Sequence, residues 1–280
     1  MSNSKVDKSH LPSRHVTEGP SRAPHRSYFY AMGLDEEAIA QPWVGVATCW
    51  NEAAPCNISL NRQAQAVKLG VKKGYGTPRE FTTITVTDGI AMGHEGMRSS
   101  LASRDAIADT VELTMRGHCY DAIVGLAGCD KSLPGMMMAM VRLNTPSVFI
   151  YGGSILPGRL AGKDVTVQDV FEAVGKHQAG NMSDAELEVL ERVACPSAGA
   201  CGGQFFGDVG EEPGEFSGMG GEDATPVKLG KEVRALRQDG QCIGIQNQAP
   251  PLPPVGRGWG WGDIAWWGNM AWWGDRKGRR

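Results

Sequence analysis

Four short apolar runs alternate with helical segments through the middle of this chain, and this alternation restricts its fold more than any other feature. The expected strands lie near residues 44–49, 82–87, 122–127 and 147–151, and the expected helices lie over residues 60–71, 100–115 and 136–143. Strands that alternate with helices typically form a parallel sheet with helices on its faces. The sequence therefore predicts an α/β fold, with a parallel sheet flanked by helices in three layers, α/β/α.

Two of the expected helices also predict which side chains enter the core. The apolar side of the helix over 100–115 consists of Leu101, Ile107, Val111 and Met115. Ser100 or Ser103 is a candidate cap for the start of this helix. In the helix over 136–143 we expect methionines such as Met136 and Met140 to pack in the core.

Metal-capable side chains follow three of the expected strands. Cys56 comes after the first strand and Asp88 directly after the second. Cys129, Asp130 and Lys131 occupy the turn after the third. The carboxyl ends of parallel strands meet at one edge of the sheet, where ligands bind. We therefore expect these side chains, distant in sequence, to share one site.

Asp88 and Asp130 form a candidate site for a hard cation. Carboxylate oxygens are the ligands that Mg²⁺ prefers. Asp88 precedes Gly89, however, and an Asp-Gly pair is also ordinary turn chemistry. Lys131 could ligate a cation only if it were carbamylated, and otherwise it would balance the charge of the two aspartates as an ammonium group. The residues alone leave these alternatives open.

The chain contains seven cysteines, an odd number in a protein of 280 residues, which favours metal binding or catalysis over a disulfide framework. Cys56, Cys129 and Cys201 are each flanked by tight-turn residues. Thiolates bind iron–sulfur clusters, and glycines allow backbone N–H groups to approach the sulfur atoms. Because no C-x₂-C pair is present, zinc and simple burial of the thiols remain alternatives.

Composition and charge narrow the choice of partners and compartment. The chain has 28 basic and 31 acidic residues and a net charge of -3, which gives no reason to expect a nucleic acid or an anionic membrane as partner. Its sequence contains no apolar run long enough to span a bilayer. Residues 1–27 form an expected polar arm without the apolar stretch of a secretory signal. We therefore expect a cytoplasmic protein.

The character of the sequence changes after Phe205. Residues 206–280 are rich in glycine and proline, and six of the eight tryptophans lie between positions 259 and 273. We expect an irregular, aberrant tail that arises from a reading-frame error or from divergence. This division leaves residues 28–205 as the expected α/β domain.

Several stretches resemble the N-terminal part of the dihydroxy-acid and phosphogluconate dehydratase family. They are residues 44–52 with 55–57, 88–97, 129–135, 152–158 and 194–203. The Cys-Asp-Lys-x-x-Pro-Gly stretch that begins at Cys129 is highly specific to that family. The resemblance covers about residues 10–205, and the context of Cys56 is more similar to the branch with a 2Fe-2S cluster than to the 4Fe-4S branch.

The resemblance implies two sets of metal ligands. They are Cys56, Cys129 and Cys201 for the iron–sulfur cluster, and Asp88, Asp130 and carbamylated Lys131 for Mg²⁺. Three cysteines would leave one iron position open as a Lewis acid for the C3 hydroxyl of a substrate. The ion would hold the carboxylate and the C2 hydroxyl.

The implied activity is that of a hydro-lyase in valine and isoleucine biosynthesis, which converts 2,3-dihydroxy-3-methylcarboxylic acids to 2-keto acids. Family members are longer, form homodimers, and carry a serine base in a C-terminal domain that this sequence lacks. We therefore expect no catalytic base in this chain, and weak or no activity of the chain alone. Two alternatives remain: a sugar-acid dehydratase of the same family, and a non-catalytic iron–sulfur or zinc-binding protein.

Overall fold

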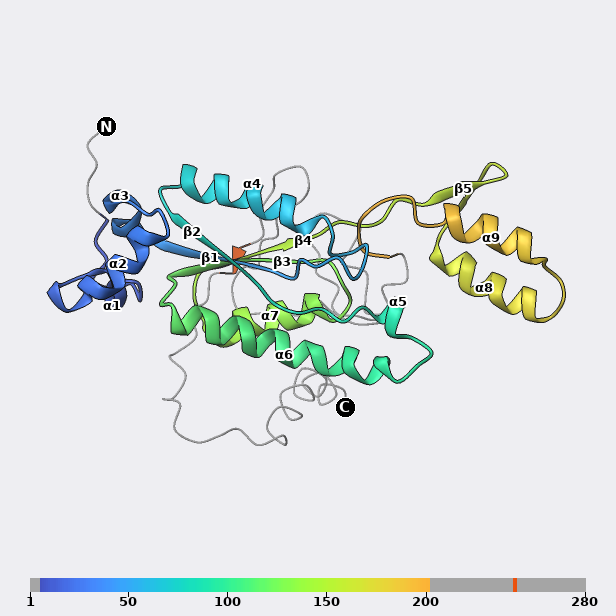
Figure 1. The fold of residues 1–280 in the computed structure, drawn as a ribbon, viewed down its shortest axis with the longest axis horizontal. Coiled ribbons are helices and arrows are strands. Elements are labelled where there is room, and N and C mark those ends of the chain that lie inside the picture. Colours follow the sequence, from blue (N-terminus) through green and yellow to red (C-terminus); the bar gives the residue numbers. More distant parts are fainter. Residues whose placement is uncertain (1–5, 202–243, 246–280) are drawn as a thin grey trace, which may run out of the picture. The chain divides into compact units, whose positions relative to one another are not determined.

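The computed structural model describes residues 6–201 and 244–245, and it confirms the predicted α/β fold (Figure 1). The strands of its main sheet are β1 Trp43–Thr48, β2 Thr77–Thr82, β3 Ala122–Ala127, β4 Ser147–Tyr151 and β7 Gly244–Ile245. The first four strands are parallel, and β7 pairs with β4 in the antiparallel direction. Helix α4 (Leu60–Lys73) covers one face of the sheet, while α6 (Gly96–Gly117) and α7 (Ser132–Leu143) lie on the other. The three predicted layers are therefore present.

The order of the strands contains a reversal near the centre of the sheet. Neighbouring strands follow the order β2-β1-β3-β4-β7. The connection from β1 to β2 therefore goes in one direction, and the connection from β2 to β3 returns past β1. Ligands of open α/β sheets bind outside the carboxyl ends of the strands at such a reversal. The loops after β1 and β3 thus frame the position where a functional site is expected.

The second strand lies earlier in the chain than residues 82–87, where the sequence pattern predicted it, so that boundary is wrong. Pro78 falls inside β2, which tolerates a proline because it is an edge strand of the described sheet. The neighbouring strand β1 ends at Thr48, and one further hydrogen bond joins Thr83 N to Thr48 O (2.9 Å). Beyond it, the alternating residues form an irregular connection to the short helix α5 (Asp88–Ala91).

Helix α7 packs its methionines against β3. Met136 and Met140 are buried in the main core, as predicted. Gly125 of β3 makes this close approach possible, because a Cβ atom at that position would lie 2.4 Å from Met140 Cε. The turn that precedes α7 is therefore held at a fixed distance from the sheet.

Helix α6 differs from its predicted orientation at one position. Ile107, Val111 and Met115 are buried in the core, as expected. Leu101, however, is 54% exposed, whereas Ser100 is fully buried. Position 101 lies about 100° around the helix from position 100, and only position 100 is in phase with the buried residues. The buried side of α6 therefore begins with a hydroxyl group.

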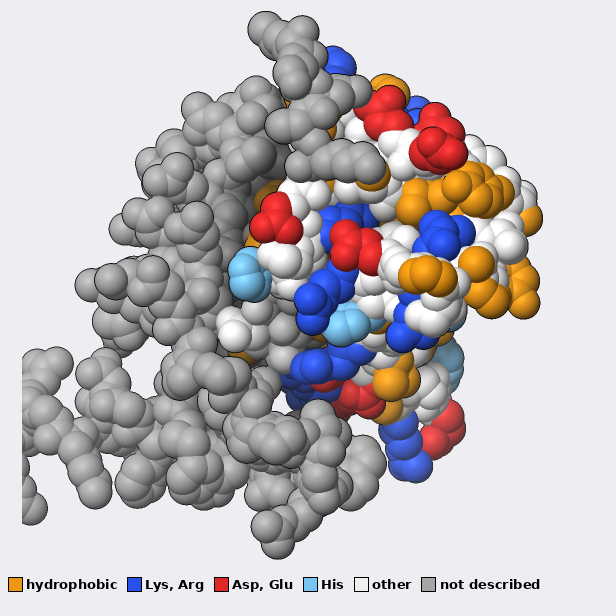
Figure 2. Space-filling view, turned by 90° about the vertical axis from the view of Figure 1, so that its left-hand side faces the viewer, with side chains coloured by type: hydrophobic (Ala, Val, Ile, Leu, Met, Phe, Trp, Pro, Cys, Tyr) orange, Lys and Arg blue, Asp and Glu red, His pale blue; other side chains and the backbone are white. Residues whose placement is uncertain are grey.

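The residues before β1 pack against the amino end of the sheet. They form the helices α1 Arg14–Thr17, α2 Ala23–Ala31 and α3 Glu36–Ala40, with a 3-10 turn at Pro20–Arg22. The Asp121 carboxylate, just before β3, accepts hydrogen bonds from Ser13 N (2.8 Å) and Trp43 N (2.7 Å). Lys8 is buried and donates from Nζ to Ile39 O (2.8 Å). Figure 2 views this end, where basic, acidic and apolar side chains are interspersed.

A second group of elements follows the main sheet. It contains β5 Gly158–Leu160, β6 Lys163–Val165, α8 Val167–Gln178 and α9 Asp184–Val193. Val165, Ala173 and Leu190 form its small apolar core. None of the helices in the described residues is both long and apolar enough to cross a membrane. The predicted tail, residues 206–280, lies outside the described residues apart from Gly244–Ile245, and its origin stays a prediction.

Candidate metal centre

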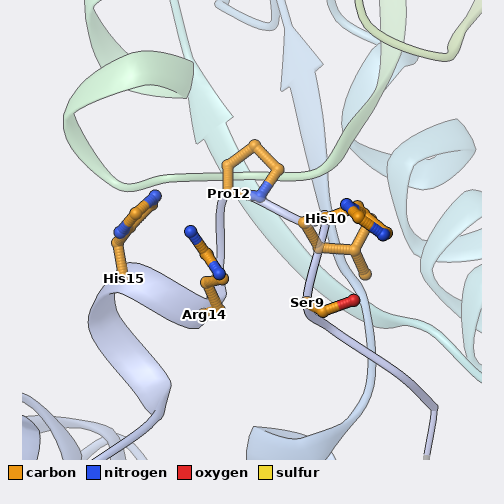
Figure 3. A pocket seen from close by; sticks show the side chains of 6 residues that line it. Ser9, His10, Pro12, Arg14 and His15 are labelled. Atoms are coloured by element: carbon orange, nitrogen blue, oxygen red, sulfur yellow. The ribbon is translucent and has the colours of Figure 1, made fainter.

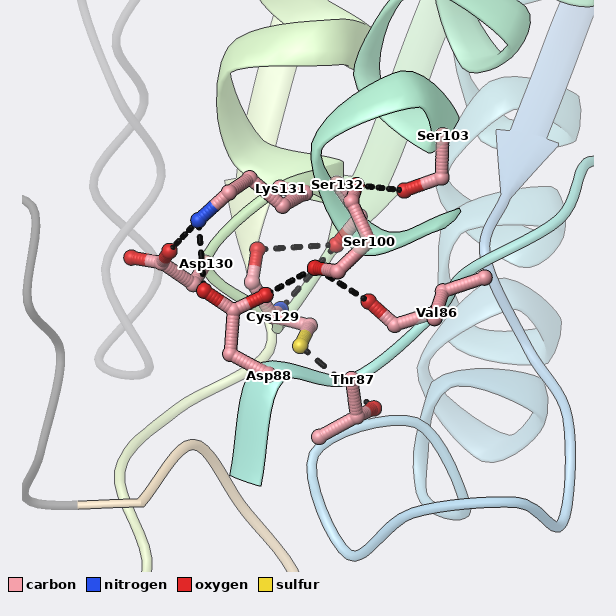
Figure 4. A network of polar contacts seen from close by, with 9 residues as sticks. All are labelled: Val86, Thr87, Asp88, Ser100, Ser103, Cys129, Asp130, Lys131 and Ser132. Atoms are coloured by element: carbon pink, nitrogen blue, oxygen red, sulfur yellow. Dashed lines mark hydrogen bonds and ion pairs between the residues drawn. The ribbon is translucent and has the colours of Figure 1, made fainter. Parts of the chain in front are cut away.

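The structure brings Asp88, Asp130 and Lys131 together at the carboxyl edge of the sheet (Figure 4). Lys131 Nζ lies 2.5 Å from Asp88 Oδ2 and also forms an ion pair with Asp130 Oδ2. All three residues are buried, with 5%, 8% and 4% of Asp88, Asp130 and Lys131 exposed. The lysine therefore bridges two carboxylates from different loops, in the charge-balancing arrangement that the sequence left open.

Burial and hydrogen bonding act against each other in this group, which we call the carboxylate centre. Burial disfavours the ammonium of Lys131, but its hydrogen bonds to Asp130 and Asp88 outweigh this and raise the lysine pKa. Burial also opposes ionisation of Asp88, yet hydrogen bonds from Lys131 and Ser100 lower the pKa of this carboxyl. Burial and the neighbouring Asp88 raise the pKa of Asp130. Asp88 is thus the better satisfied carboxylate of the pair.

One oxygen atom of the carboxylate centre is available to bind an additional ligand. Asp130 Oδ1 is buried and has no hydrogen-bond partner among the described residues. Leaving a buried acceptor unsatisfied costs about 1–3 kcal/mol, and a cation would remove that cost. Across residues 6–201, no three His, Cys, Asp or Glu side chains are placed to hold a metal ion as they stand, because the third member here is a lysine. The donor set fits Mg²⁺ once Lys131 no longer carries its ammonium charge.

The sequence did not identify Ser100 as part of this centre. Ser100 Oγ donates to Asp88 Oδ1 and lies 3.4 Å from Val86 O. Its own carbonyl oxygen accepts from Ser103 Oγ at 2.6 Å. The signal was present in the helical phase of position 100, which matches the buried side of α6. A serine on a buried helix side indicates a polar partner rather than a cap.

Cys56 and Cys129 form a second group beside the carboxylate centre, which we call the thiol centre. Each is 5% exposed, and they pack with Ala54 and Ala200. Thr87 Oγ1 lies 3.8 Å from Cys56 Sγ and 3.5 Å from Cys129 Sγ. The sequence did not identify Thr87, because a threonine in an alternating β-branched run predicts only a strand.

The two thiols differ in acidity because they share a hydrogen bond. A hydrogen bond from Cys56 lowers the pKa of Cys129 from 9.0 to about 7, although burial opposes this. The same hydrogen bond, together with burial, raises the pKa of Cys56. The pair therefore favours the proton on Cys56 and the thiolate form on Cys129. A thiolate is the form of cysteine that binds metals.

Close backbone packing aligns the loops of the thiol centre. A Cβ atom at Gly128 would lie 2.3 Å from Cys56 O, so only glycine allows the loops after β1 and β3 to approach this closely. Gly199 N donates to Pro55 O (2.9 Å), and Ala200 N donates to Gly153 O (2.7 Å).

These two hydrogen bonds hold the segment that leads to Cys201 beside the loops of the thiol centre. Ala200, the residue before Cys201, packs with Cys56 and Cys129, and the charge of Cys201 is the smallest of the causes that raise the pKa of Cys56. Three thiols are a donor set that fits an iron–sulfur cluster and also fits zinc, although within residues 6–201 they are not yet gathered into a ready-made metal site.

Two other features lie outside this site. His94 is exposed, and its ring nitrogens contact Ile90 O (2.9 Å) and Gly96 N (3.1 Å), so it supports its own loop. A surface pocket of about 330 Å³ is lined by Ser9, His10, Leu11, Pro12, Arg14 and His15 (Figure 3). The adjacent Ser13 is bonded to Asp121, at the amino end of β3, whereas Cys129 follows its carboxyl end. The pocket is therefore separate from the candidate metal centre.

The fold and the site define an α/β protein with paired thiol and carboxylate centres at the reversal point of its sheet. A family model described as dihydroxy-acid/6-phosphogluconate dehydratase N-terminal matches residues 41–219, more than half of the chain. The chain belongs to this family.

Three curated relatives carry dihydroxy-acid dehydratase names. The one from Dinoroseobacter shibae is 90% identical over 199 residues, which cover 71% of this chain and 34% of the relative. The one from Parvibaculum lavamentivorans is 82% identical over 199 residues, with the same two coverages. Dihydroxy-acid dehydratase 2 from Bradyrhizobium diazoefficiens is 69% identical over 236 residues, or 84% of this chain and 40% of the relative. The chain thus spans between a third and two fifths of their lengths, and the matched region continues past residue 205.

Proposed function

We propose that this chain forms the metal-binding N-terminal part of a dihydroxy-acid dehydratase. The proposed reaction removes water from 2,3-dihydroxy-3-methylcarboxylic acids and gives 2-keto acids, in valine and isoleucine biosynthesis. One observation carries the proposal: the turn after β3 presents Cys129 to the thiol centre and Asp130 with Lys131 to the carboxylate centre. Two chemically different centres on one turn suit a reaction that needs two electrophiles.

The proposed ligands divide between the two centres. Cys56, Cys129 and Cys201 would hold a 2Fe-2S cluster, and Asp88, Asp130 and carbamylated Lys131 would hold Mg²⁺. When bound, the two groups would supply Lewis acids for the departing C3 hydroxyl and for the substrate carboxylate. Support comes from the unpartnered Asp130 Oδ1 and from the lowered pKa of Cys129.

The remaining chemistry concerns what the protein side chains do. Carbamylation of Lys131 requires its neutral amine, so the lysine must first lose the proton that Asp88 and Asp130 stabilise. Ser100 keeps the Asp88 carboxylate oriented while that exchange occurs. We assign no described residue to the removal of the C2 proton, and we propose that the serine base of the family acts from its C-terminal domain. This chain alone would then have weak or no activity.

The proposal extends to partners and compartment. The ligand would be a small dihydroxy acid, the intact family member a cytoplasmic homodimer, and neither a nucleic acid nor a membrane would be a partner. The names of the relatives support a dihydroxy acid rather than a sugar acid as substrate.

Anaerobic reconstitution of the chain with iron, sulfide and Mg²⁺ tests the proposal. We expect bound iron and sulfide with visible charge-transfer absorption, which Cys129→Ser abolishes and Cys195→Ser, at an exposed thiol, leaves unchanged. Binding of zinc without sulfide would contradict the cluster assignment. Turnover of 2,3-dihydroxyisovalerate at a normal enzymatic rate would contradict the assignment of the base to another domain.

A further inference from the structure

The hydroxyl group of Thr87 contacts both buried sulfur atoms of the thiol centre. Its Oγ1 is 3.5 Å from Cys129 Sγ (Figure 4) and 3.8 Å from Cys56 Sγ, which are both hydrogen-bond distances for sulfur. The three residues come from three different loops, which follow β1, β2 and β3. One small polar group therefore contacts the sulfur atoms of two different loops.

We propose that Thr87 is the positioning residue of the thiol centre, which orients the sulfur atoms of Cys56 and Cys129 for the cluster. This inference rests on the proposed function for its account of the cluster, whereas the contact itself is an observation of the structure. In the structure the Cys129 thiol donates to Thr87 Oγ1, and the threonine hydroxyl keeps one proton of its own to donate to one acceptor at a time. When both cysteines are metal-bound thiolates, they can only accept, and Thr87 becomes the donor to the centre.

Thr87 also connects the thiol centre to the carboxylate centre through the backbone. The next residue is Asp88, which Lys131 holds in the carboxylate centre. Cys129 and Asp130 form a second adjacent pair of the same kind. Each pair gives one side chain to the thiol centre and the next to the carboxylate centre. The contact between Thr87 and Cys129 joins the two pairs, so a displacement of either loop moves both centres.

This contact has a measurable electronic consequence. Hydrogen bonds to the sulfur atoms are among the factors that set the reduction potential of an iron–sulfur cluster. A donor at Cys129 stabilises negative charge on the sulfur, and the reduced cluster carries more of that charge. Loss of the hydroxyl therefore shifts the reduction potential to more negative values, which a purely structural role would not do.

Three variants of the full chain test the role of Thr87. Thr87→Val removes the hydroxyl and keeps the branched shape, and Thr87→Ser keeps the hydroxyl. Thr83→Val is the matched control, because Thr83 lies in the same connection but its hydroxyl contacts Thr110 Oγ1 (2.6 Å). Each protein is reconstituted anaerobically with iron and sulfide, its fold is checked by circular dichroism, and its reduction potential and visible absorption are measured.

The expected result is a more negative potential and an altered charge-transfer band in Thr87→Val. Thr87→Ser and Thr83→Val should match the unmodified chain. Identical potentials and bands in Thr87→Val and the unmodified chain would overturn the proposal. If Thr87→Val does not fold, the smaller Thr87→Ala variant must give the same shift.

A second measurement separates failure of this inference from failure of the proposed function. If the unmodified chain binds no iron and sulfide, the cluster assignment fails, and the metal-free chain then tests the contact. Iodoacetamide labelling of Cys129 is compared at neutral pH with labelling of the exposed Cys195. We expect Thr87→Val to slow Cys129 labelling several-fold and Thr87→Ser to restore it. Equal rates in all variants would overturn the role of Thr87.

Discussion

The carboxylate centre and the thiol centre are adjacent, but they balance their charge in different ways. In the carboxylate centre, the Lys131 ammonium compensates Asp88 and Asp130 directly. In the thiol centre, Cys56 and Cys129 share a hydrogen bond beside a neutral hydroxyl. Under the proposed ligand assignment, the first would have to change chemically before a metal ion replaced its own cation, whereas the second would only have to lose a proton. The two centres should therefore respond differently to mutation and to pH.

The largest expected effect is that of removing the cation of the carboxylate centre. Lys131→Met leaves two buried carboxylates without their ammonium partner, which should lower the free energy of unfolding by about 3–5 kcal/mol. Urea denaturation followed by circular dichroism measures this loss. Lys68→Met is the control, because its pair with Glu80 is partly exposed and should contribute only about 0–1 kcal/mol. Similar losses in both variants would remove the distinction between buried and surface pairs.

The two aspartates of the carboxylate centre should contribute unequally to the free energy of unfolding. Asp88→Asn should cost about 2–3 kcal/mol, since this carboxylate accepts charged or buried hydrogen bonds from Lys131 and Ser100. Asp130→Asn should cost less, because the raised pKa of Asp130 shows that its ionised form is the poorly stabilised one. The same denaturation measurement compares the two variants. A larger loss in Asp130→Asn would contradict the assignment of Asp88 as the better satisfied carboxylate.

The thiol centre should depend on its backbone packing. Gly128→Ala places a Cβ atom against Cys56 O, and we expect a loss of about 1–3 kcal/mol together with reduced iron binding. Gly175→Ala in α8 is the control, because a Cβ atom there meets nothing within 4 Å. Alanine is also the better helix former, so the control should be neutral or stabilising by up to about 1 kcal/mol. Thermal unfolding and iron content distinguish the two substitutions.

The smallest expected effect is the response of the thiol centre to pH. In the metal-free chain, labelling of Cys129 should fall as the pH drops through about 7, while Cys56 stays less reactive. Because the pKa of Cys129 is lowered on folding, its ionisation contributes stability that is complete above 9.0 and lost as the pH falls to about 7. Mass spectrometry of labelled peptides measures both rates. Equal rates for the two cysteines across this range would contradict the shared hydrogen bond.

The sequence predicted the layers of the fold and most members of the two centres. Asp88 meets Lys131 although the preceding strand was misplaced, because the connection after β2 still returns to the edge formed by β1 and β3. A β-branched alternation shows that a segment is extended, but it does not show whether a partner strand lies beside it. β1 ends at Thr48, and this fact about the neighbour decides where β2 stops pairing.

The roles of the Thr87 and Ser100 hydroxyl groups in the two centres, and the position of the loop that carries Cys201, were harder to predict from the sequence. Thr87 and Ser100 are ordinary residues for a strand and for a helix start, and only their buried partners reveal their roles. The approach of Cys201 depends on backbone hydrogen bonds from residues 199 and 200 to Pro55 and Gly153. Backbone hydrogen bonds between distant segments leave no pattern in the residue types.

The hydrogen bond between Ser13 and Asp121 has a consequence for synthesis of the chain. These residues are separated by 108 positions, so Ser13 leaves the ribosome long before its acceptor does. At ~5–20 residues per second, the delay is roughly 5–20 seconds. During that interval Ser13 lacks its acceptor and the sheet lacks its central strand β3, so the first residues are accessible to chaperones and proteases. The N-terminal residues of this chain are therefore synthesised first but form their hydrogen bond to Asp121 late.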